Sequence, residues 1–194
     1  LFVELAQANI EEFQELAVGK VITLCAHCFN SFDRYYPELG ATWQTIPHSV
    51  LIDRLIREGK LSVKRDATQK ITFHDPCYHA RHNDIVDETR GVVAALGQLV
   101  EMPRNRKDSF CCGGGGGNYW SREGGTARIS EARAGEALDT GADKIATSCP
   151  FCLLMLSSGA ARHTEQRKVY DVAELVVAAL PDESTHAAAP RLTD

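Results

Sequence analysis

Cysteines account for most of the chemistry that this sequence could carry. Two adjacent cysteines precede five glycines in the stretch 109–117, SFCCGGGGG. A disulfide between neighbouring cysteines is strained, so both sulfurs are better placed to bind a third group. The glycines carry no side chain and accept left-handed backbone conformations, so a bulky ligand could approach the main chain. The stretch favours a metal or metal–sulfur cluster over a phosphate, because it does not end in the Lys-Ser/Thr of a phosphate-binding loop.

The other cysteines form two C-x-x-C pairs and one single residue. The full set is Cys25, Cys28, Cys77, Cys111, Cys112, Cys149 and Cys152. An odd number in this arrangement is atypical of a secreted disulfide framework and favours metal or redox chemistry. Structural zinc and a thioredoxin-like redox pair stay open as alternatives, since both also use C-x-x-C. Simple burial of thiols would explain two or three of these residues but not their pattern.

Four histidines stand near the cysteines in the sequence. His27 lies inside the first C-x-x-C pair, and the other three surround Cys77: His74, His79 and His82. Each could act as a ligand or a proton relay. More often, a histidine in such a position hydrogen-bonds to a ligand residue or lies at the surface, so both interpretations are kept.

Composition and charge exclude several function classes. Hydrophobic residues make up 44% of the 194 residues and charged residues 24%, which is typical of a globular protein in water. A net charge of −5 and the lack of a basic run argue against a nucleic-acid partner. The sequence shows neither a signal peptide nor an apolar run of about 18 residues. Because it starts with Leu1 inside a helical pattern, we expect a fragment of a longer cytoplasmic protein.

Hydrophobic periodicity predicts alternating helices and short strands. The predicted helices cover 1–17, 29–36, 49–59, 85–96, 129–138 and 171–180, and the predicted strands cover 20–24, 43–46, 71–73, 98–102, 144–147 and 169–170. In such an arrangement, the carboxyl ends of the strands and the starts of the following helices meet at one sheet edge. Cys25, Cys77 and Cys149 all stand at strand ends. Cys149 occupies an N-cap position with Pro150 at N1, where helix amides favour a thiolate.

One part of the chain repeats another. KVITLCAHC at 20–28 matches KIATSCPFC at 144–152, and each segment is preceded by a helix and followed by helix, strand and helix. The equivalent of 71–124 is absent before the first copy, which predicts one and a half repeats. We therefore expect the C-terminal half of a first domain at 1–66, a complete second domain at 67–181, and a disordered tail at 182–194. The second repeat contains five thiols, more than the four that zinc or a cubane cluster needs.

The spacing of Cys77, Cys111-Cys112-Gly113 and Cys149-x-x-Cys152 resembles the CCG cysteine-rich domain. This domain occurs in one subunit of heterodisulfide reductase, in the iron–sulfur subunit of glycolate oxidase and in lactate-utilisation proteins. The fuller phrases are most similar to the heterodisulfide-reductase-related iron–sulfur proteins; they are HDPCY at 74–78, SFCCG at 109–113, ATSCPFC at 146–152 and CAHCFN at 25–30.

The resemblance implies a fold and a set of ligands. The fold is α/β, with tandem CCG domains of small, mostly parallel sheets flanked by helices, the first domain being truncated. The implied cofactor is a [4Fe–4S]-type cluster, non-cubane in heterodisulfide reductase, bound by Cys77, Cys111, Cys112, Cys149 and Cys152. Cys25 and Cys28 are implied as the closing metal-binding pair of the first motif, although Ala26 stands where the family often has proline. Zinc in one of the two motifs remains an alternative cofactor.

The resemblance also implies a function. We expect an iron–sulfur oxidoreductase module, not active alone, that passes electrons from a donor such as electron-transfer flavoprotein to an acceptor such as quinone or a disulfide. Full-length relatives commonly carry ferredoxin-type clusters, and sometimes a membrane region, upstream. The expected partners are therefore redox proteins or such upstream domains, in the cytoplasm or at the cytoplasmic face of a membrane. The competing hypothesis is a non-catalytic zinc-binding module with a structural or interaction role.

Overall fold

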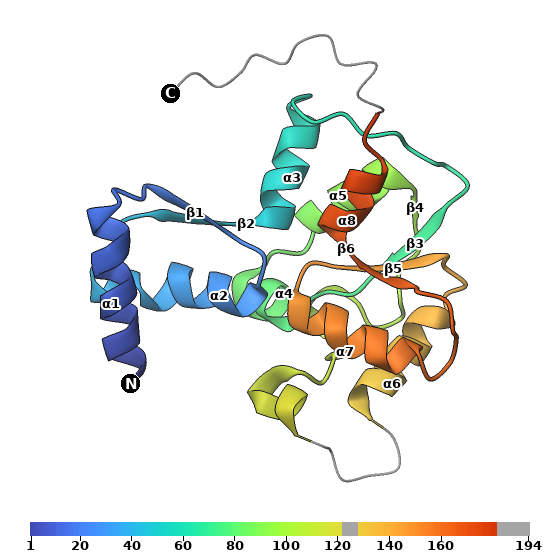
Figure 1. The fold of residues 1–194 in the computed structure, drawn as a ribbon. Coiled ribbons are helices and arrows are strands. Elements are labelled where there is room, and N and C mark those ends of the chain that lie inside the picture. The colour runs from blue at the N-terminus through green and yellow to red at the C-terminus, as the bar shows by residue number, and fades with distance from the viewer. Residues whose placement is uncertain (122–127, 182–194) are drawn as a thin grey trace.

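The fold is mixed α/β with two small parallel sheets, as the sequence predicts (Figure 1). This architecture comes from a computed structural model that describes residues 1–121 and 128–181. The tail predicted to be disordered at 182–194 lies outside the described residues. Helices and strands alternate along the chain, which places the helices against the sheets and the strand ends along common edges.

The first sheet pairs β1 (Lys20–Thr23) with β2 (Gln44–Pro47) in parallel. It is accompanied by α1 (Phe2–Glu15), α2 (Ala26–Asn30) and α3 (His48–Arg57), and α2 continues into a π-helical turn at Ser31–Tyr35 and a 3-10 turn at Pro37–Leu39. The helix predicted for 29–36 begins earlier, at Ala26. Cys25 has an extended backbone (φ −103°, ψ 126°) and directly precedes it, so the first C-x-x-C also opens a helix.

The second sheet has the order β4-β3-β5-β6, with all neighbours parallel. Its strands are β3 (Lys70–Phe73), β4 (Gln98–Leu99), β5 (Lys144–Thr147) and β6 (Val169–Asp171). Its helices are α4 (Cys77–Asn83), α5 (Glu88–Leu96), α6 (Ile129–Leu138), α7 (Pro150–Ala160) and α8 (Val172–Ala178). A capping box starts α8, in which the side chains of Asp171 and Glu174 accept hydrogen bonds from backbone amides. The short helix α4 has no counterpart among the predicted helices.

The two halves repeat the same element order. The series α1-β1-α2-β2-α3 corresponds to α6-β5-α7-β6-α8. The strand registers also correspond: Val21 pairs with Thr45, and Ile145 pairs with Val169 at the same sequence offset. The boundary near residue 66 stays a prediction.

The halves pack closely against each other. α3 contacts α5 and α8, and α2 contacts α4 (Figure 1). α3 and α5 approach closely at Gly91, where a Cβ would lie 2.1 Å from Oδ1 of Asp53 and would force that side chain to move. Across the same junction, the ring of His48 lies 3.0 Å from Oδ1 of Asp171 through Nε2. This packing brings the start of α2, with the first C-x-x-C, toward the cysteines of the second half.

Candidate metal centre

Three cysteines stand where the sequence places them, at the helix starts that follow parallel strands. Cys25 and Cys149 precede the first residues of α2 and α7. Cys77 is the first residue of α4 and follows Pro76. Pro150 occupies the first turn of α7, as predicted, and its fixed φ suits that position. Strand–helix junctions from both sheets therefore present thiols to one region of the molecule.

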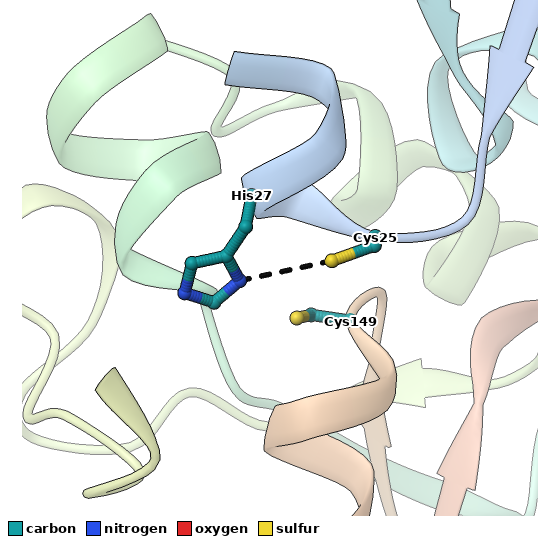
Figure 2. A group of neighbouring side chains, drawn as sticks. All are labelled: Cys25, His27 and Cys149. Carbon is teal, nitrogen blue, oxygen red and sulfur yellow. Dashed lines mark hydrogen bonds between the residues drawn. The ribbon is translucent and has the colours of Figure 1, made fainter. Parts of the chain in front are cut away.

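The seven thiols form an unbroken line, in which neighbouring thiols interact closely enough to shift a pKa. Their order is Cys28, Cys25, Cys149, Cys152, Cys112, Cys111 and Cys77. The line joins both halves, because Cys25 of the first motif meets Cys149 of the second. Figure 2 shows these two sulfurs side by side, with the ring of His27 beside them. All seven are free thiols in this structure.

Burial varies along this line of thiols. Three neighbours in its middle are buried: Cys149, Cys152 and Cys112. Cys77, Cys111 and Cys25 are half-buried, and Cys28 at one end is exposed. The buried sulfurs lie in the largest apolar cluster, with Leu156 and Ile145. Soft sulfur donors in an apolar environment suit zinc, copper(I) and iron–sulfur centres rather than hard cations such as Mg²⁺.

The glycines after Cys112 do not all play the same role. Gly113 adopts a left-handed conformation (φ +85°), and its amide donates to Sγ of Cys111 at 3.3 Å. A Cβ on Gly114 would lie 3.7 Å from Sγ of Cys112 and 3.0 Å from Cγ of Met155. The chain then forms a 3-10 helix over Gly115–Trp120. The first two glycines therefore let the main chain approach the sulfurs, while the later ones shape the turn.

The thiols cannot all ionise next to one another. Hydrogen bonds with Cys149 and then Cys28 lower the pKa of Cys25, and hydrogen bonds with Cys112 and then Cys77 lower the pKa of Cys111. The hydrogen bond to Cys111 raises the pKa of Cys112 to about 12, and the pKa values of Cys28, Cys77 and Cys152 are also raised by hydrogen bonds to their sulfur neighbours. A cationic centre would remove this competition, because metal ligation deprotonates thiols.

The four histidines have different environments. His27 lies 3.7 Å from Sγ of Cys25 through Nδ1 (Figure 2), and hydrogen bonds with Cys149 and Cys25 raise its pKa to about 9. A ring nitrogen of His74 lies within 4.8 Å of the sulfurs of Cys112 and Cys152. The other two histidines contact side chains other than cysteine. His79 pairs with the hydroxyl of Ser148 at 3.2 Å, and His82 stacks on Tyr78.

Two buried arginines brace the segments that carry the cysteines, and sequence reasoning missed both. Arg90 of α5 binds both carboxylate oxygens of Asp75, at 2.7 and 3.0 Å. Arg133 of α6 donates to Nδ1 of His74 at 3.0 Å and to the hydroxyl of Ser109 at 3.2 Å. The Ser109 hydroxyl also donates to the Asp75 carbonyl at 3.2 Å. The residues before Cys77 and before Cys111 are thus tied into one network.

The sequence does contain a signal that could have identified these two buried arginines. Arg90 precedes Val92 and Val93 in α5, and Arg133 stands between two alanines in α6. A charged residue among small or apolar residues on a helix is seldom buried unless it is paired. Both are buried here; Arg90 has its acceptor Asp75 in the segment HDPC, and Arg133 has acceptors in HDPC and in SFCCG.

Comparison with known protein families agrees with this geometry. The family model of the CCG cysteine-rich domain matches residues 1–33 and 71–157. Both segments include cysteines of the line. The chain therefore belongs to the CCG cysteine-rich domain family.

Three curated relatives illustrate the family. A probable iron-sulfur-binding oxidoreductase, FadF, of Bacillus subtilis is 40% identical over 91% of this chain and 26% of its own length. The EtfAB:quinone oxidoreductase of Syntrophomonas wolfei is 35% identical over 91% of this chain and 26% of its own length. One subunit of the dihydromethanophenazine:CoB–CoM heterodisulfide reductase of Methanosarcina barkeri is 32% identical over 91% of this chain and 44% of its own length. The chain thus spans between a quarter and a half of these relatives.

Proposed function

We propose that this chain is an iron–sulfur electron-transfer module of an oxidoreductase and that it holds a [4Fe–4S]-type centre. The observation that carries the proposal is the unbroken line of seven thiols, which joins both C-x-x-C pairs to the adjacent cysteines. The names of three relatives support the redox class, since each is an oxidoreductase or a reductase.

The residues fit such a centre better than they fit a single zinc ion. Tetrahedral zinc uses four ligands, whereas the second motif alone supplies five thiols. We assign the ligands as Cys77, Cys111, Cys112, Cys149 and Cys152, with Cys25 and Cys28 as the closing pair of the first motif. The position of Gly114 supports this assignment, because a Cβ there would touch Sγ of Cys112 at van der Waals distance and press on Cγ of Met155 at 3.0 Å. Zinc in one motif stays the alternative.

A bound iron–sulfur centre would supply one-electron redox chemistry at potentials set by its ligands and surroundings. The chain contributes the scaffold for that chemistry. Three buried cysteines exclude water from the middle of the site, while the exposed Cys28 leaves one end open to further ligands or to a partner. His27 places a positive charge beside Cys25 and Cys149, which offsets the negative charge of the thiolates.

The wider context is part of the proposal. We take 1–66 as the C-terminal half of a first CCG domain and 67–181 as a complete second one. The partners would be an electron donor such as electron-transfer flavoprotein, an acceptor such as quinone or a disulfide, and upstream ferredoxin-type or membrane domains of the same polypeptide. The proposed location is the cytoplasm or the cytoplasmic face of a membrane. Across residues 1–121 and 128–181, each helix is too short or too polar to span a bilayer.

The experiment that tests the function compares cysteine variants after anaerobic preparation. Cys111→Ser and Cys112→Ser should each change the visible absorption and the electron paramagnetic resonance spectrum of the reduced protein. Cys28→Ser is the comparison variant, because we assign Cys28 to the first motif: its loss should leave the spectrum of the centre in the second motif unchanged. If Cys111→Ser and Cys112→Ser both retain the wild-type metal content and lack any paramagnetic signal, a zinc site with four of the thiols replaces this proposal.

A further inference from the structure

His74 is a buried ring whose proton position is fixed by its neighbour. Nε of Arg133 donates a hydrogen bond to its Nδ1 at 3.0 Å. A guanidinium can only donate, so Nδ1 must offer a lone pair and cannot carry a proton. A ring whose Nδ1 accepts in this way is neutral, and its single proton resides on Nε2.

Arg133 is itself held firmly in this orientation. Its side chain is fully buried and donates to the carbonyl of Arg104 at 2.9 Å and to the hydroxyl of Ser109 at 3.2 Å. It also pairs with the carboxylate of Glu136 at 3.1 Å. With its donors engaged in this way, the guanidinium cannot turn away without breaking several interactions at once. The tautomer of His74 is therefore a fixed property of the fold.

The proton on Nε2 has no acceptor among residues 1–121 and 128–181, although the atom is fully buried. Buried N–H groups are almost always hydrogen-bonded, because an unsatisfied donor loses its water without replacement. One nitrogen of the same ring lies within 4.8 Å of the sulfurs of Cys112 and Cys152. Sulfur carrying negative charge is the acceptor that this environment offers.

We infer that His74 donates a hydrogen bond from Nε2 to a sulfur of the centre bound by Cys112 and Cys152, rather than ligating the metal. Arg133 is the positioning residue that fixes the required tautomer. The inference rests on the proposed function. Its consequence is electrostatic: a hydrogen bond to sulfur stabilises the more negative, reduced state, so it raises the reduction potential.

The test uses the full-length protein with its centre loaded anaerobically. His74→Phe keeps an aromatic ring but removes the donor, whereas His74→Gln keeps an amide N–H of similar reach. We expect His74→Phe to lower the reduction potential by about 59 mV for a one-electron couple, which is a tenfold change in the ratio of oxidised to reduced protein. His74→Gln should recover most of that shift. His82→Phe is the control, because His82 stacks on Tyr78 and belongs to neither candidate metal-binding group among the described residues.

A second measurement needs no variant at all. In wild-type protein labelled with ¹⁵N-histidine, hyperfine spectroscopy of the reduced centre should show only weak nitrogen coupling and a proton that exchanges in D₂O. Strong coupling to a directly bonded nitrogen would overturn the inference, as would an unchanged potential in His74→Phe with an intact centre. Wild-type protein that binds no iron would instead refute the proposed function, so the two failures are distinguishable.

Discussion

Replacement of Arg133 by methionine tests the idea that buried arginines hold the cysteine segments in place. The side chain of Arg133 has no exposed surface and makes contacts with three segments. It donates to His74, to Ser109 and to the carbonyl of Arg104, and it pairs with Glu136. Methionine fills a comparable volume but leaves these acceptors without their donor.

The magnitude follows from these contacts. Hydrogen bonds that involve a charged group contribute about 1.5–3 kcal/mol each, but contributions within one network are not additive. Removal of one partner from a buried ion pair costs about 3–5 kcal/mol. We therefore expect Arg133→Met to lower the free energy of unfolding by about 3–5 kcal/mol, a large share of the roughly 5–15 kcal/mol typical of a folded domain.

Arg104→Met provides the matched control. Arg104 binds the same Glu136 at 2.8 Å, but its side chain is 50% exposed. An exposed ion pair contributes roughly 0–1 kcal/mol, so this variant should lose much less stability. The assay is urea denaturation of metal-free, reduced protein followed by circular dichroism. Equal losses in the two variants would refute the argument that the buried network braces the site.

Two further changes test other parts of the structure. Gly159→Ala should destabilise the fold by about 1–3 kcal/mol through overpacking, because the added Cβ would lie 2.3 Å from the backbone oxygen of Ser130. Gly135→Ala is its control: the added Cβ would lie 3.8 Å or more from other atoms, so this variant should not lower the melting temperature. The third prediction concerns pH. Burial raises the pKa of Glu136, but hydrogen bonds from Arg104 and the charge of Arg133 outweigh it, so the pKa lies below its ordinary 4.5. A depressed carboxyl pKa stabilises the fold above pH 4.5, and that stabilisation disappears as the pH falls through the folded-state value. The stability difference between wild type and Glu136→Gln should therefore shrink on acidification in denaturation curves, and a difference that is constant with pH would contradict this assignment.

Local patterns were sufficient to predict much of the fold. The strand at 144–147 and the helix at 129–138 have the predicted bounds, because each combines a clear apolar pattern with turn residues at its ends. The helix predicted from residue 171 begins at Val172, after a capping box whose two partners lie within one turn. The start of α2 was wrong by three residues, because Cys25 is an unusual residue at an N-cap and no proline follows it.

Contacts between distant segments could not be predicted in the same way. The sequence indicates that Cys25 and Cys149 each follow a strand, but only the packing of the two halves shows that their sulfurs are neighbours. Arg133 and His74 are far apart in the sequence, and their hydrogen bond depends on how α6 lies against the segment after β3. The repeat itself was predictable because it compares the sequence with itself and needs no knowledge of packing.

The central claim is that the line of thiols binds iron and sulfide. The most direct test is to measure iron, acid-labile sulfide and zinc in wild-type protein and in Cys112→Ser, both prepared anaerobically. We predict a brown wild-type protein with about equal iron and sulfide, as expected of a [4Fe–4S]-type centre, and a loss of both in Cys112→Ser. Colourless wild-type protein with stoichiometric zinc and no iron would contradict the account.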